Sequence, residues 1–323
     1  MLPSDLMTRL PSLDAFSSST QGRGESGATN DDRETAIEML FSENPSERAL
    51  LTGDPSDGAR WQAIQAKFQR ALTSFMATGG HGVPVAVGSL SSVNRQGGRT
   101  RNYDFDGGFV SSNGTVLTLK IELKRGESIY DQPQFLQLYA KQGDMVTSAI
   151  EPYASWFYDN YISSVTLLAG VAAPTKAEYL ARCFGTNYDV FEHTKVLYRL
   201  DVGGSAMNRK LKALAFKSID GYLSNLESNP ALVDLGAIQR RLDAQLGKLF
   251  VSWDPIQQDF VVEVFSKASM TLSGHISFKK RRDGQRSCLV VTNMASQPIQ
   301  ALLRWKNHNC LLGPAWQISL ATS

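Results

Sequence analysis

The chain has 323 residues, of which 42% are hydrophobic and 20% are charged, which is typical of a globular protein with a sizeable core. No apolar run reaches the roughly 18 residues needed to cross a bilayer, and the first residues lack a secretory signal. We therefore expect no membrane partner and an intracellular location, either cytoplasmic or nuclear. Three widely spaced cysteines and four scattered histidines argue against a disulfide framework or a zinc site.

The net charge of +2 hides an uneven distribution of charge along the chain. Residues 1–60 carry 5 Lys and Arg against 11 Asp and Glu, residues 61–194 carry 11 of each, and residues 195–323 carry 17 against 9. The acidic front cannot attract a polyanion by itself, whereas the basic last third can. An ordinary solvated basic face is the alternative explanation.

Helical and strand patterns follow one another along the first third of the chain. Residues 1–30 are rich in Ser, Thr and Gly without periodicity, so we expect a disordered tail there. Apolar stripes predict a helix beginning near Asp31 and a second helix over residues 60–78. The stretch VPVAVGSL at 83–90 is a strand candidate, and a polar loop rich in Gly and Arg follows it.

A β-hairpin over residues 103–126 is the clearest local structure in the sequence, with its turn at 112–114. Its second half alternates with a period of two. Leu117, Leu119, Ile121 and Leu123 face one side, and Thr118, Lys120, Glu122 and Lys124 face the other. One side of this strand is therefore expected to be buried.

Further elements complete a layered core. The patterns predict helices at 133–142, 152–161 and 174–183, and strands at 164–171 and 195–202. The order of these elements predicts an α/β fold, in which an α/β/α core with a mixed central sheet spans residues 31–200. Residues 201–323 are expected to form a basic C-terminal region, first helical and then β-rich. That region is either a subdomain or an extension of the main sheet.

Charged side chains meet on the polar side of the hairpin. Glu122 and Lys124 share one side of their strand, and the neighbouring strand can bring Asp104 or Asp106 within several ångströms of Glu122. Two carboxylates and the backbone carbonyl of Leu123 are hard oxygen ligands, which suit Mg²⁺, and Mn²⁺ is expected to substitute for it. Lys124 can then assist an attacking water or stabilise a phosphoryl transition state. An ordinary hairpin with one wet face is the alternative.

This arrangement resembles the PD-(D/E)xK nuclease superfamily, whose core is restriction-endonuclease-like. The resemblance is carried by Asp106 in YDFDGGFV and by Glu122-Leu123-Lys124 in TLKIELKRG. It reaches about a third of the chain and none of residues 201–323. It implies a Mg²⁺-dependent phosphodiesterase that cleaves nucleic acid, with DNA favoured over RNA. In that role Asp106 and Glu122 bind the metal, and Lys124 assists the water.

Other positions take their expected roles from the same resemblance. Asp104 is the rival metal ligand, although Gly107 allows a close approach beside Asp106 and favours that residue. Gln137, in the helix expected after the hairpin, resembles a glutamine that positions the water or contacts the phosphate backbone in some branches. Glu34 or Glu38 of the first expected helix is a candidate for an additional metal ligand.

Basic residues in two loops are candidates for holding nucleic-acid phosphates. Arg99 and Arg101 lie just before the hairpin, and Lys280, Arg281 and Arg282 surround an Asp-Gly turn. Plain solvated loops are the alternative in both places. Two other functions stay open: a nucleic-acid-binding protein on the same fold with an inactive metal site, and a two-carboxylate hydrolase of another substrate, such as a sugar.

Overall fold

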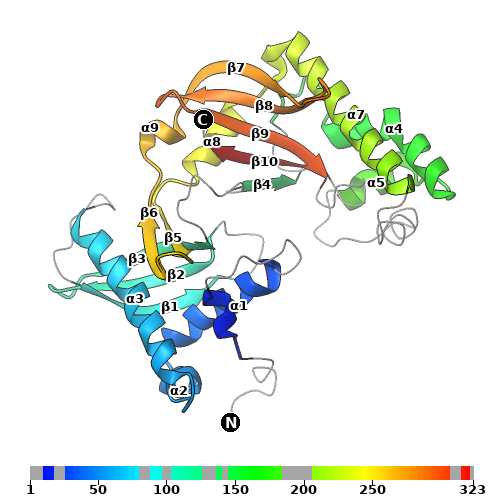
Figure 1. Ribbon diagram of the computed structural model, residues 1–323. Helices are drawn as coiled ribbons and strands as arrows, with labels where there is room; N and C mark the ends of the chain where they lie inside the picture. The colour runs from blue at the N-terminus through cyan, green and yellow to red at the C-terminus, as the bar shows by residue number, and fades with distance from the viewer. Residues whose placement is uncertain are drawn as a thin grey trace. The chain divides into compact units, whose positions relative to one another are not determined.

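The computed structural model describes residues 10–17, 26–79, 88–96, 103–125, 136–139, 145–183, 206–305 and 314–320 (Figure 1). These residues have a mixed α/β architecture and form two compact units, each with its own five-stranded sheet. Unit 1 comprises residues 1–132 and 246–266, and unit 2 comprises residues 133–245 and 267–323. None of the described helices is long and apolar enough to cross a membrane.

Unit 1 packs helices against one face of a mixed sheet (Figure 1). The strand order is β1-β2-β3-β5-β6, in which β3 and β5 are parallel and the other neighbours are antiparallel. The elements of unit 1 are η2 (Leu13–Phe16), α1 (Ser26–Leu40), α2 (Pro45–Thr52), α3 (Gly58–Ala77), β1 (Gly88–Arg95), β2 (Phe105–Ser111), β3 (Val116–Arg125), β5 (Lys248–Asp254) and β6 (Asp259–Glu263).

The apolar side of the predicted hairpin lies in the core of unit 1. Leu119, Ile121 and Leu123 are fully buried and belong to one cluster with apolar side chains of α1 and α3. Burying a side chain of this size contributes about 1.5–3 kcal/mol. The inward face of β3 and the two helices near 31 and 60–78 are therefore confirmed, although Leu117, at the outer end, is only partly buried.

Strand β5 joins this sheet from a distant part of the chain, which the sequence patterns did not predict. The helix that precedes it ends at Asp243, and β5 then pairs with β3 in parallel. All seven residues of β5 are buried, as in a central strand that is covered on both faces. The sheet of unit 1 therefore draws on residues 248–263, and the compact units do not divide at residue 200.

The expected disordered tail contains an ordered turn. Phe16, at the end of η2, is only 6% exposed and makes an edge-on contact with Trp253, with 5.3 Å between ring centroids. The side chain of Arg33 donates a hydrogen bond to the carbonyl of Ala15 (3.0 Å). Disorder is thus the wrong prediction for residues 13–16, because a single buried aromatic ring anchors this short segment to the core.

Unit 2 contains an antiparallel sheet in the order β4-β10-β9-β8-β7. Helix α7 packs along β8 and beside α4 (Figure 1). The elements of unit 2 are β4 (Leu136–Tyr139), α4 (Tyr153–Ala169), α5 (Lys176–Cys183), α7 (Ala206–Ser228), η5 (Pro230–Leu232), α8 (Leu235–Asp243), α9 (Lys267–Met270), β7 (Leu272–Lys280), β8 (Arg286–Asn293), β9 (Pro298–Trp305) and β10 (Pro314–Leu320). Strands β7 to β10 confirm the prediction that the C-terminal region is first helical and then β-rich.

Two predicted elements of unit 2 are wrong. Residues 136–139 form β4 within the helix expected at 133–142, since their backbone pairs with β10. The strand expected at 164–171 is instead the last part of α4, whose buried residues Ile162, Val165 and Ala169 recur at helical spacing. Gly170 ends that helix in the left-handed conformation, with φ of 67°. The strand expected at 195–202 lies outside the described residues.

Candidate active site in unit 1

The register of β2 and β3 decides which aspartate faces Glu122. Asp106 pairs with Lys120, and Phe105 pairs with Ile121, so the next position places Asp104 opposite Glu122. The backbone N–H of Asp104 donates to the carbonyl of Ile121 (2.9 Å) and continues the ladder. The prediction that Asp106 faces Glu122 is therefore wrong. Asp104, which lies two residues earlier and on the same side, is the residue that faces Glu122.

Asp104 is partly buried and is held by the backbone of β3. Its Oδ2 accepts a hydrogen bond from the N–H of Leu123 (2.7 Å). Burial raises the pKa of Asp104 to about 7, and the Glu122 carboxylate adds to this rise, while Lys124 opposes it. A perturbed carboxyl group beside specific charged partners marks a functional-site candidate.

Glu122 lies between two lysines. The Nζ of Lys124 is 2.5 Å from Oε1 of Glu122, and the Nζ of Lys248 is 3.5 Å from Oε2. Lys248 begins β5, and its side chain is only 1% exposed. Lys248 was not predicted from the sequence. A lysine directly before the apolar run LFVSW was the signal that could have identified it.

The two lysines respond differently to this environment. Burial acts to lower the pKa of Lys124, but Glu122 and Asp104 outweigh it, and the pKa is raised. For Lys248 burial prevails over the attraction of Glu122, and the pKa is lowered. Lys124 is therefore the lysine that the site holds firmly in its charged form.

Helix α1 adds charge to the same region of unit 1. Arg95, at the end of β1, lies 2.7 Å from a carboxylate oxygen of Glu34 and also pairs with Asp31. Burial raises the pKa of Glu34, and Arg95 opposes that rise. Glu34 acts electrostatically on both Asp104 and Lys124, so α1 contributes a third carboxylate near the hairpin. Glu38, the other expected candidate, has a pKa raised by burial.

The other predicted site residues are distributed as follows. The side chain of Leu123 points into the core. Gln137 belongs to unit 2, where its backbone pairs with Gln317. Lys280 ends β7, and Arg281 and Arg282 follow it in the hairpin turn, whereas Arg99 and Arg101 lie outside the described residues. The structure thus gathers Asp104, Glu122 and Lys124 in unit 1.

Acidic ligands for a metal are few in the part of the chain that the structure describes. Within it, no group of three or more His, Cys, Asp or Glu side chains is arranged to hold a metal ion. Comparison of the chain with protein-family models, curated proteins and solved structures finds no match. A functional assignment therefore rests on the geometry and charge of the cluster at Asp104, Glu122 and Lys124.

Proposed function

We propose that unit 1 is a Mg²⁺-dependent phosphodiesterase that cleaves nucleic acid, DNA in preference to RNA, on a restriction-endonuclease-like core. One observation carries this proposal. Asp104 lies opposite Glu122, and Lys124 contacts Glu122, while burial and Glu122 together raise the pKa of Asp104 to about 7. A surface hairpin that merely meets water has no need to bury two neighbouring carboxylates.

The chemistry of this cluster suits a hard divalent cation. Asp104 and Glu122 offer carboxylate oxygens, and the Leu123 carbonyl follows Glu122 in the chain, while Glu34 lies close enough to influence Asp104. The raised pKa of Asp104 reports burial and like-charge repulsion, which either a proton or a cation relieves. When bound, Mg²⁺ or Mn²⁺ would polarise a phosphodiester and acidify a water molecule.

The protein's own groups have distinct tasks in this proposal. Lys124 remains an ammonium ion and stabilises the negative charge that develops on a phosphodiester. Lys248 holds Glu122 from the neighbouring strand, and the N–H of Leu123 fixes the orientation of Asp104. Lys124 now contacts Glu122, so binding of substrate has to redirect that side chain.

Cleavage of plasmid and linear DNA in Mg²⁺, Mn²⁺ and EDTA tests the proposal. We expect Lys124→Gln and Asp104→Asn to lower the rate by roughly 10²–10³-fold, because the first removes a positive charge at the reacting phosphate and the second weakens a carboxylate ligand of the metal. Asp106→Asn is the matched control, since Asp106 is two residues from Asp104 and faces Lys120 of β3 instead of Glu122. Circular dichroism confirms that each variant is folded.

Two outcomes would overturn this assignment. Undiminished cleavage by both Lys124→Gln and Asp104→Asn would show that the cluster is not the active site. Loss of cleavage in Asp106→Asn, with retention in Asp104→Asn, would return the ligand position to Asp106. A parallel RNA substrate of the same sequence tests the preference for DNA.

A nucleic-acid-binding protein with an inactive metal site is the second candidate. It is favoured by the contacts of Glu122, because Lys124 and Lys248 engage its two carboxylate oxygens and would compete with a metal ion for them. This candidate predicts DNA affinity that falls steeply with salt, but no turnover in Mg²⁺ or Mn²⁺. The same cleavage assay, combined with a binding assay in EDTA, separates the two candidates.

A further inference from the structure

The tip of the β7–β8 hairpin lies on helix α7 in unit 2. Gly284, with φ of 81°, provides the left-handed residue of the turn. Beside it, the guanidinium of Arg281 lies 3.7 Å from the ring centroid of Phe216, which projects from the middle of α7. This cation–π contact holds Arg281 in a defined position.

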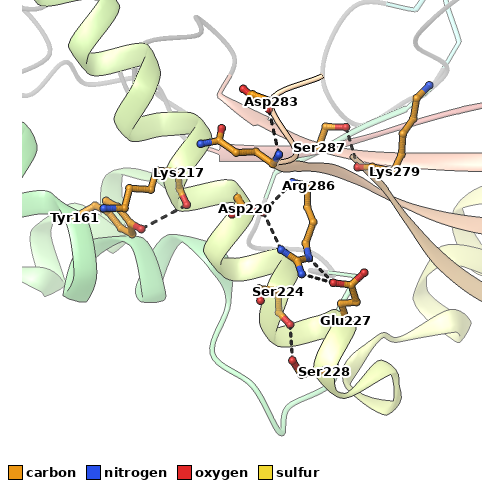
Figure 2. Close-up of polar contacts among 11 residues, drawn as sticks. Tyr161, Lys217, Asp220, Ser224, Glu227, Ser228, Lys279, Asp283, Arg286 and Ser287 are labelled. Carbon is orange, nitrogen blue, oxygen red and sulfur yellow. Dashed lines mark hydrogen bonds and ion pairs between the residues drawn. The ribbon is translucent and has the colours of Figure 1, made fainter. Parts of the chain in front are cut away.

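Arg286 fastens the hairpin to the same helix. Its backbone N–H and Nη1 both donate to Oδ1 of Asp220, at 2.8 and 3.0 Å, and its Nε donates to Oε2 of Glu227 at 2.6 Å (Figure 2). Asp220 and Glu227 are the two acidic residues in the sequence of α7. Both acidic side chains are thus engaged by Arg286 and turned toward the base of the hairpin.

The hairpin tip and helix α7 both carry exposed basic side chains. They include Lys212 and Lys217 on α7, with Lys279, Lys280 and Arg282 on the hairpin. Among the residues that the structure describes, none of these five forms an ion pair. Lys212 lies four residues before Phe216 and so neighbours it on the helix surface. Asp283, the acidic residue of the tip, pairs with Arg281 at 3.5 Å.

We propose that Lys212, Lys217, Lys280, Arg281 and Arg282 form a basic platform that binds the phosphate backbone of a nucleic acid. Two elements supply its charges, and Arg286 and the stacked Arg281 fix those elements together, so the platform is organised before binding. Arginine and lysine are the side chains that contact phosphates, and the platform presents both. This proposal is independent of the phosphodiesterase activity of unit 1.

Fluorescence anisotropy in EDTA measures this binding without cleavage. The probes are a labelled 20-mer duplex DNA, its single strand and the matching RNA, titrated with the full chain at several salt concentrations. Two variants each remove two charges: Lys212→Gln/Lys217→Gln and Lys280→Gln/Arg282→Gln. The matched control, Arg240→Gln/Lys267→Gln, removes two exposed charges from other elements of unit 2.

Counterion release sets the expected size of the effect. Affinity varies with the salt concentration to a power of about −0.9 for each phosphate contact on duplex DNA. Relative to 1 M salt, each contact therefore raises the affinity about fivefold at 0.15 M salt. Each platform variant should therefore weaken duplex binding by about 30-fold and reduce the salt slope by about 2, while the control binds as the parent does.

Either of two results would overturn the platform. An equal loss of affinity in the control variant would mean that overall charge, rather than this surface, binds the probe. If the protein binds none of the three probes but binds vesicles of anionic lipid, a membrane surface is the partner instead. If the protein binds DNA through the platform but does not cleave it in Mg²⁺, the phosphodiesterase is refuted and the platform is not.

Discussion

Replacing Asp104 by Asn should stabilise the metal-free protein above neutral pH. An ionised Asp104 lies in a partly buried position opposite Glu122, where burial and a like charge disfavour its charged form. Asparagine has nearly the same shape and does not ionise. Its side-chain oxygen can still accept the hydrogen bond from the N–H of Leu123, which measures 2.7 Å to Asp104.

The size of this effect follows from the pKa of Asp104. Folding raises it from an ordinary 3.8 to about 7, and each pKa unit is worth about 1.4 kcal/mol. The native state therefore binds the proton more tightly than the unfolded state does. The corresponding stability, about 4 kcal/mol, is fully present below pH 3.8 and is lost as the pH rises through about 7.

Urea unfolding at pH 5 and pH 8.5 in EDTA measures this loss. Because pH 5 already lies above the unfolded pKa, the free energy of unfolding of Asp104→Asn should fall by about 3 kcal/mol less between the two pH values than that of the parent. Asp106→Asn retains Asp104 and should follow the parent. Identical pH dependence in the parent and in Asp104→Asn would refute the reasoning, because no strained carboxylate would then exist at this position.

Three further predictions concern the contacts that support the two units. Glu122→Gln should destabilise the fold by about 3–5 kcal/mol, because it leaves Lys248 buried without its carboxylate. Lys248→Met should cost less than about 1 kcal/mol. Urea unfolding measures both costs, and equal costs would contradict this prediction. Phe16→Ala should cost about 3–5 kcal/mol by the same assay, since the ring is 6% exposed and packs on other aromatic rings; an effect below 1 kcal/mol would mean that η2 is not anchored. Arg286→Ala should speed amide hydrogen exchange in the β7–β8 hairpin, with a loss of about 1–3 kcal/mol of protection there, because it removes charge-assisted hydrogen bonds to Asp220 and Glu227; unchanged exchange would show that the clamp does not hold the hairpin.

The inward face of the hairpin could be predicted because side-chain alternation depends only on local geometry. Leu119, Ile121 and Leu123 are buried as expected. Alternation alone could not predict which aspartate faces Glu122, because Asp104 and Asp106 are two residues apart and lie on the same face. Counting outward from the turn does settle it: Asn113 is nine residues from both Asp104 and Glu122. The turn, rather than the alternation, sets the register.

Other parts of the fold depend on contacts that no local pattern contains. Lys248 reaches Glu122 only because β5 pairs with β3 across a long separation in the chain. The run at 164–171 has the composition of a buried strand, yet it continues α4 because its apolar residues are buried at helical spacing. Tertiary packing overrides intrinsic preference in such a short apolar run.

The most direct measurement of the central claim is the conversion of supercoiled plasmid to nicked or linear DNA by the unmodified protein, with Mg²⁺ and with EDTA. A phosphodiesterase at Asp104, Glu122 and Lys124 predicts conversion in Mg²⁺, none in EDTA, and conversion slowed by roughly 10²–10³-fold with Asp104→Asn in Mg²⁺. Conversion that proceeds equally in EDTA, or that proceeds at the parent's rate in Asp104→Asn, would contradict the account.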